Sequence, residues 1–260
     1  MGILLFSIAL AASVIGAICG IGGGVIIKPV LDMFGVASVA TISFLSSCTV
    51  LTMSFYSVGR NVVSKSGSIE MGTGTPLALG AAVGGICGNL LFSWVKDALG
   101  GSTAGAAQSI CLMILTFGTL IYTVKKSGIS TKSVTSKTAC LVIGFALGGF
   151  SSFLGIGGGP FNLVVLHYFF GMETKKAASN SLYIILLSQI TNLLVSLIGH
   201  TVPEFEPMAL VLMICGGIGG GIIGRSINKK IDDRMVDKLF ICLLFVIVLI
   251  CIYNTVKYLR

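Results

Sequence analysis

Charge is the scarcest property of this sequence. The 260 residues include 17 Lys and Arg and 9 Asp and Glu, so that charged residues make up 10% of the chain, whereas an ordinary soluble domain carries about 25%. So few charges cannot cover a soluble protein of this length, because exposed positions are where charges collect. Hydrophobic residues make up 55% of the chain, which also excludes a disordered protein. The composition predicts an all-α polytopic membrane protein.

Several chemical motifs are missing as well. No Asp or Glu lies in the middle of an apolar stretch, since Asp32 and Glu70 fall near stretch ends, and this predicts no built-in carboxylate proton relay. The sequence has no phosphate-binding loop and no HExxH zinc motif. The eight cysteines lie inside apolar stretches without zinc-like spacing, and we interpret them as packing residues. We therefore predict no enzyme activity, no cofactor, no metal site and no nucleic-acid partner, with the lipid bilayer as the surroundings.

Long apolar stretches take up most of the chain instead. Most of them reach the roughly 17–25 residues that a membrane-spanning helix needs. The stretches are 3–19, 36–58, 74–95, 104–124, 138–154, 160–171, 178–199, 207–224 and 239–256. A basic connector, residues 127–137, divides a first transmembrane repeat, residues 1–126, from a second, residues 138–260.

The two halves share three motifs in the same order. Gly20–Gly24 (GIGGG) recurs as Gly155–Gly159, Ala40–Ser43 is matched by Ala178–Ser181, and Gly84–Gly88 is matched by Gly220–Gly224. The offsets of 135, 138 and 136 residues are nearly equal, which indicates an internal duplication. Internal repeats of this kind are typical of secondary transporters.

The basic residues decide how the repeats are oriented. If each GIGGG tract interrupted one continuous span, eight Lys and Arg would lie on one side of the membrane and nine on the other. If each tract is instead the tip of a re-entrant hairpin, thirteen share one side and only Lys28, Lys96, Lys257 and Arg260 remain opposite. The second arrangement fits the positive-inside rule. It predicts two inverted repeats, each a re-entrant hairpin plus three spanning helices, in a multi-pass protein of the cell (plasma) membrane with a cytoplasmic connector and both termini outside.

The lengths of the returning arms agree with hairpins. As helices, residues 25–35 and 160–171 would be roughly 17 Å long, too short for a hydrocarbon core of about 30 Å. Each arm begins just after its glycine tract, so that its free N–H groups and positive dipole end point at the tip. Two such ends near the membrane midplane predict an anion site.

Polar residues of the following helices complete the predicted site. Hydroxyls and amides donate hydrogen bonds to an oxyanion without a buried charge. The predicted substrate-binding residues are Gly22, Gly23, Gly24, Thr41, Ser43, Gly157, Gly158, Gly159, Asn180, Ser181 and Gln189. The sequence leaves open whether Lys28 attracts the anion or extends to the interface, and it leaves the role of His167 open as well.

Other glycines have a simpler interpretation. Gly80, Gly84 and Gly88, like Gly216, Gly220 and Gly224, recur every four residues and predict small-residue faces for helix packing. If the GIGGG tracts also served only packing, the chain would be a non-transporting membrane scaffold or subunit. That alternative stays open at this point.

With GIGGG opening each half, Pro29 following the first tract, and Thr-x-Ser or Asn-Ser starting the next helix, the chain resembles the sulfite exporter TauE/SafE family. This family is also described as the four-toluene sulfonate uptake permeases, and the resemblance covers essentially the whole chain. It implies a secondary permease or exporter for sulfur-containing oxyanions such as sulfite and organosulfonates. A permease for another small anion, such as a carboxylate, remains an alternative, and the sequence leaves a homodimer open.

Overall fold

The computed structural model describes residues 2–64 and 69–259, and within these ranges all regular elements are helices. Lys65 and Arg260, two of the basic residues used to orient the repeats, lie outside the described residues. The first half contains α1 (Gly2–Cys19), α2 (Gly24–Phe34), α3 (Val39–Val63), α4 (Met71–Leu99) and α5 (Gly101–Lys125). A short 3-10 helix, η1 (Lys126–Gly128), is followed by α6 (Lys137–Phe153), α7 (Phe161–Phe170), α8 (Thr174–Ile198), α9 (Pro207–Lys230) and α10 (Asp233–Leu259). The predicted all-α class is confirmed.

The helix lengths confirm a polytopic membrane protein. Within the described ranges, seven helices are long and apolar enough to cross a bilayer, namely α1, α3, α4, α5, α8, α9 and α10. The returning arms α2 and α7 have 11 and 10 residues, as the sequence led us to expect. At a rise of about 1.5 Å per residue neither can cross a membrane by itself.

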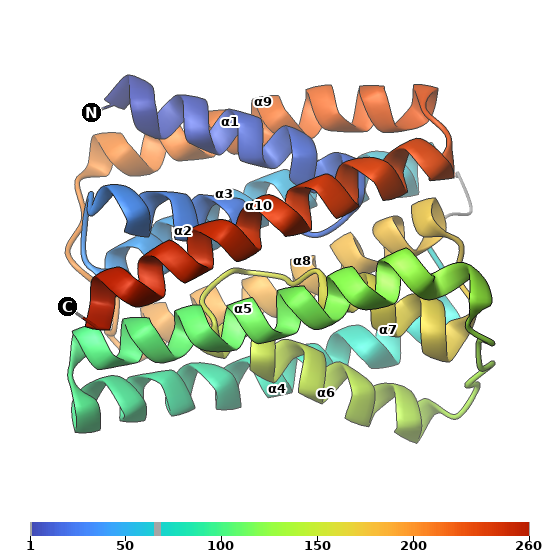
Figure 1. Cartoon of the computed structure of the whole chain (residues 1–260), viewed down its shortest axis with the longest axis horizontal. Helices are drawn as coiled ribbons and strands as arrows, with labels where there is room; N and C mark the ends of the chain where they lie inside the picture. Colours follow the sequence, from blue (N-terminus) through green and yellow to red (C-terminus); the bar gives the residue numbers. More distant parts are fainter. Residues whose placement is uncertain (1, 65–68, 260) are drawn as a thin grey trace.

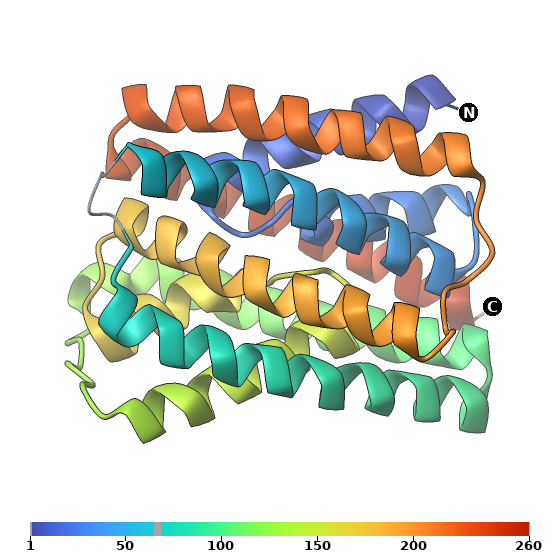
Figure 2. The same ribbon diagram turned by 180° about the vertical axis from the view of Figure 1, so that it is seen from behind.

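The chain reverses direction at both glycine tracts. A Cβ atom on Gly23 would lie 3.2 Å from the backbone of Ala12, so the start of α2 lies beside the middle of α1. Figure 1 shows that α2 runs back to the end of the bundle that carries both termini, whereas α6 and α7 start and finish at the opposite end. The same arrangement is visible from behind in Figure 2. The two tracts therefore lie in the interior of the bundle.

Small-residue faces join the two halves. A Cβ atom on Gly84 of α4 would lie 1.9 Å from the Phe145 carbonyl oxygen of α6, and one on Gly224 of α9 would lie 2.4 Å from the Val14 carbonyl oxygen of α1. Only glycine permits these backbone approaches, so the predicted packing role of the two glycine faces is confirmed. Helix α1 of the first half thus packs on α9 of the second half, and α6 of the second half packs on α4 of the first.

Candidate functional site

A glycine turn in the interior of the bundle joins the two helices of each pair, α1–α2 and α6–α7. The first glycine turn is Gly20–Gly24 and the second is Gly155–Gly159. Positive φ angles occur at matched positions of the two turns, +75° and +73° at Gly20 and Gly22, and +63° and +69° at Gly155 and Gly157. L-residues with side chains seldom adopt this backbone region, which explains why the reversals are built from glycine.

The structure brings the two glycine turns into direct contact. A Cβ atom on Gly24 would lie only 1.7 Å from the Ile156 carbonyl oxygen, and one on Gly158 would lie 3.1 Å from the Ile21 carbonyl oxygen. Within the described ranges, the N–H groups from Gly22 to Val25 donate no hydrogen bond to protein atoms. Such free donors are expected in the first turn of a helix, and here they lie in the buried interior. The start of α2 therefore offers N–H groups and positive dipole charge inside the bundle.

A cavity of about 330 Å³ reaches the second glycine turn, and we call it the glycine-turn cavity. It extends to Lys96 and to the α8–α9 linker, at the end of the bundle that carries the termini. Its wall near the turn consists of polar side chains and exposed glycine backbone, contributed by Ser43, Ser47, Ser152, Gly155, Gly157, Gln189 and Asn192. The cavity therefore brings together residues from both halves.

Gln189 is the most informative side chain of this cavity. Only 2% of its surface is exposed, and its Oε1 atom has no hydrogen-bond partner in the described structure. A Cβ atom on Gly157 would lie 3.3 Å from that oxygen, so the amide lies directly at the second glycine turn. A buried amide oxygen without a hydrogen bond is costly, roughly 1–3 kcal/mol, and a ligand offsets this cost only if it donates a hydrogen bond to that oxygen.

Asn192 follows Gln189 by three residues and lines the same cavity. Its Nδ2 atom donates to the Ser152 hydroxyl at 2.5 Å, and its Oδ1 atom is buried without a partner among the described residues. Sequence reasoning missed both Asn192 and Ser152. The signal for Asn192 was present, because a spacing of three places it on the same face of α8 as Gln189.

Lys28 does not extend to the membrane surface. Its side chain is buried, with 3% exposed, and its ammonium group donates to the Ser43 hydroxyl at 3.0 Å, the Leu154 carbonyl at 2.8 Å and the Gln108 side-chain oxygen. This ammonium group therefore joins α2 to α3, α5 and the residue that precedes the second glycine turn. Gln108 was not among the predicted site residues, since no local pattern links it to Lys28.

The other polar candidates have structural partners. Thr41 donates to the Glu204 carbonyl at 3.0 Å, and Asn180 accepts from the Glu70 N–H at 2.9 Å. Thr41 thus ties the first turn of α3 to the linker before α9, and Asn180 ties the second turn of α8 to the linker before α4. The Ser181 hydroxyl accepts a hydrogen bond from the amide of Asn162 at 3.4 Å. None of these residues lines the glycine-turn cavity.

A second cavity, of about 380 Å³, lies toward the opposite end of the bundle, and we call it the basic cavity. Its charged lining comes from Lys175, Lys176, Arg225 and Lys229. It is also lined by Ala178, whose Cα atom would lie 2.2 Å from a Cβ atom on Gly20, so one wall residue of this cavity contacts the first glycine turn. The basic residues were used in the sequence only to orient the repeats, and the cavity they form depends on the packing of α8 and α9 against α3.

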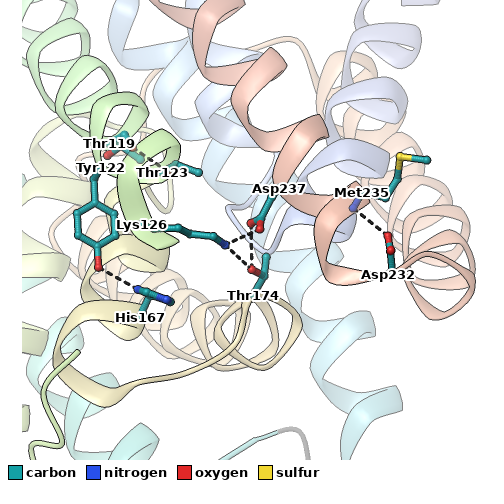
Figure 3. A network of polar contacts seen from close by, with 9 residues as sticks. All are labelled: Thr119, Tyr122, Thr123, Lys126, His167, Thr174, Asp232, Met235 and Asp237. Atoms are coloured by element: carbon teal, nitrogen blue, oxygen red, sulfur yellow. Dashed lines mark hydrogen bonds and ion pairs between the residues drawn. The ribbon is translucent and has the colours of Figure 1, made fainter. Parts of the chain in front are cut away.

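His167 lies away from both glycine turns, near the C-terminal end of α7. Its Nδ1 atom is 2.9 Å from the Tyr122 hydroxyl of α5. Figure 3 shows this pair beside a second group, in which Lys126 forms an ion pair with Asp237 at 2.5 Å and donates to Thr174. These contacts connect α5, α7, α8 and α10 and place His167 in a helix-joining network.

Comparison with known proteins identifies the chain as a whole. No curated protein and no solved structure matches it significantly. Residues 5–250 match the family model described as "Sulfite exporter TauE/SafE", which covers nearly the full length and both glycine turns. The chain therefore belongs to the sulfite exporter TauE/SafE family.

Proposed function

We propose that this chain is a secondary permease that exports sulfur-containing oxyanions, such as sulfite or organosulfonates, from the cell across the plasma membrane. Membership of a family of membrane transporters for sulfur anions supports the class of substrate. The proposed topology has two inverted repeats with re-entrant hairpins α1–α2 and α6–α7, with both termini outside. Export has a simple driving force, since each negative charge that leaves an inside-negative cell gains about 2.3 kcal/mol per 100 mV.

The side-chain amide of Gln189 at the second glycine turn carries the proposal, because its N–H groups donate to no protein atom among the described residues. It lies in a cavity together with the Ser43 hydroxyl and the backbone of Gly157. Amide and hydroxyl donors recognise a small oxyanion, and the free N–H groups at Gly22, Gly23 and Gly24 add to them when the turns separate. In the second turn, the backbone of Gly158 and Gly159 would play the corresponding part.

Two cavities on opposite sides of one contact support alternating access. The glycine-turn cavity reaches the second turn from the end with the termini, and the basic cavity extends from the other end to Ala178, which contacts the first turn. The two turns touch each other at the contact between Gly24 and Ile156. In the proposed cycle, the anion enters from the basic cavity and leaves through the glycine-turn cavity as the hairpins move relative to each other.

Counterflow of labelled sulfite and methanesulfonate in proteoliposomes tests this function. Gln189→Leu removes the amide donor, and Gln189→Glu places a carboxylate against the anion, so we expect both to lower flux at least about tenfold. Thr191→Val is the matched control, because Thr191 lies on the same helix and bonds its own Leu187 carbonyl.

The result that would overturn the proposal is a folded wild-type protein without exchange of any sulfur anion. That outcome would favour the scaffold interpretation. Exchange of carboxylates in preference to sulfur anions would support the alternative of a carboxylate permease.

A further inference from the structure

The ammonium group of Lys28 lies directly behind the wall of the glycine-turn cavity. It contacts the Ser43 hydroxyl at 3.0 Å, and its Nζ atom is 3.0 Å from the position a Cβ atom on Gly155 would take. Ser43 and Gly155 both line the cavity, and the ring of Phe92, another lining residue, has its centre 5.8 Å from the ammonium nitrogen. A thin layer of small residues therefore separates a buried positive charge from the cavity.

No carboxylate makes a direct ion pair with Lys28 in the described structure. Its three hydrogen-bond acceptors, from Ser43, Gln108 and Leu154, are neutral oxygens. A buried ammonium group with only neutral partners is costly, and an anion nearby would lower that cost.

The charged groups around Lys28 leave one positive charge in excess. Asp32 lies one helical turn further along α2, and its carboxylate faces the ammonium groups of both Lys28 and Lys257. The thiol of Cys251 and the hydroxyl of Tyr258 are the other titratable groups that face this pair, and both are neutral when protonated. One carboxylate between two lysines gives the set a net charge of +1, and Lys96 and Asp97, which also line the cavity, add no net charge because their charges are opposite.

The hydroxyl of Ser43 connects the ammonium group of Lys28 to the cavity. Its oxygen accepts the hydrogen bond from Lys28, so its own proton is free to point into the cavity. Within the described ranges this hydroxyl donates to no protein atom, and its side chain is half-buried at the cavity wall. A hydroxyl that accepts from a cation is a stronger donor toward an anion, because bonds in such a chain polarise one another.

We infer that Lys28, acting through Ser43, is a positioning and specificity-determining residue that makes the site select monoanions, such as hydrogen sulfite or an organosulfonate, over dianions. One excess positive charge balances a monoanion, whereas a dianion leaves a net negative charge in a largely buried site. The inference rests on the proposed permease function. It goes beyond that function in naming the charge state of the transported anion.

The experiment compares wild type, Lys28→Met, Lys28→Arg and Ser43→Ala in counterflow of labelled methanesulfonate, with unlabelled methanesulfonate and sulfate as competitors. In wild type we expect methanesulfonate to compete at least about tenfold better than sulfate. Lys28→Met and Ser43→Ala should each weaken methanesulfonate competition and bring the two competitors within about threefold of each other. Lys28→Arg should retain most of the preference, because it keeps the charge.

A second measurement varies the charge of one substrate. Competition by sulfite should improve as the pH falls, because protonation converts it to hydrogen sulfite, and this improvement should be much smaller in Lys28→Met. A melting curve in detergent establishes that each variant is folded, and Ser43→Ala provides the test if Lys28→Met is not.

Two results would overturn the inference while leaving the permease function intact. One is a wild-type protein that exchanges anions but does not prefer monoanions, and the other is a folded Lys28→Met or Ser43→Ala variant with an unchanged preference. A wild-type protein that exchanges no anion at all would instead overturn the function on which the inference rests.

Discussion

The two returning arms, α2 and α7, each donate a hydrogen bond to a serine of the following helix, but they do so with different chemical groups. Lys28 of α2 donates to Ser43 of α3 at 3.0 Å, and Asn162 of α7 donates to Ser181 of α8 at 3.4 Å. The two serines occupy matched positions of the two halves, 138 residues apart. The contact is charged in the first half and neutral in the second. The two arms thus contact the following helix at matched serines, while the charge that an anion would experience is present in one arm only.

The far ends of the arms differ in the same way. Asp32 of α2 and His167 of α7 are 135 residues apart in sequence, and each faces a tyrosine near the end of a long helix, Tyr258 of α10 or Tyr122 of α5. The first half thus has a carboxyl group at the position where the second half has an imidazole. Equivalent contact positions with different chemical groups are expected if the backbone positions serve the fold and the side chains serve the two faces of a transporter.

The largest loss of stability should come from placing a methyl group in the contact between the glycine turns. Gly24→Ala would place a methyl group 1.7 Å from the Ile156 carbonyl oxygen, which is backbone and cannot move aside. Gly159→Ala, at the matched position, meets the ring of Phe161, a side chain that can rotate. We expect Gly24→Ala to lower the free energy of unfolding by about 3 kcal/mol or more, and Gly159→Ala by roughly 1 kcal/mol.

Melting temperature and monodisperse yield in detergent measure this difference. If the two alanine variants had equal melting temperatures, the tight contact would not be a property of the first glycine turn. Gly149→Ala serves as a control in α6, because among the described residues outside its own stretch of helix the nearest atom to its Cβ position is the Gly84 carbonyl oxygen at 3.6 Å, an ordinary contact.

A smaller effect is expected from the neutral arm. Asn162→Leu removes the donor to the Ser181 hydroxyl, and the loss of one buried hydrogen bond should cost about 1 kcal/mol of stability. Because Asn162 carries no charge, we expect the preference for methanesulfonate over sulfate to stay within about twofold of wild type. Competition counterflow and a melting curve on the same preparation check both parts. A lost preference in this variant would mean that selectivity does not depend on the charged arm.

Most of the fold could be predicted from the sequence, because membrane helices are specified locally. The apolar stretches predicted the helices. The repeated GIGGG tract predicted both reversals of chain direction and the short arms α2 and α7. Gln189 was predicted to be a site residue and lies at the second glycine turn. The contact between the two turns was predicted from the duplication.

What the sequence did not show depends on contacts between distant residues. Lys28 bonds Gln108 and Leu154, which lie 80 and 126 residues away, and these partners exist only because the two halves pack into each other. Thr41 and Asn180 were predicted to be substrate-binding residues. In the structure both instead form hydrogen bonds that tie the two halves together.

The smallest expected effect on stability concerns these two ties. They extend the comparison to the N-terminal parts of α3 and α8. The tie at Thr41 is a hydrogen bond to the backbone of Glu204, whereas the tie at Asn180 is supplemented by an ion pair between Lys176 and Glu70. The hydrogen bond from Lys176 holds the pKa of the Glu70 carboxyl group below its usual range. A carboxyl group with a lowered pKa in the folded state stabilises the protein above its ordinary pKa, and this contribution is lost as the pH falls through the lowered value.

Glu70→Gln should therefore destabilise the protein slightly at pH 7 and make no difference in acid. Both side chains of the pair are about 40% exposed, so solvent screening keeps the contribution below about 1 kcal/mol. The measurement is the difference in melting temperature between wild type and Glu70→Gln from neutral to acidic pH, with Glu204→Gln as the matched control whose tie uses only the backbone carbonyl. A difference that grew toward acidic pH would contradict the ion pair, since protonation of Glu70 removes the charge that distinguishes the two ties.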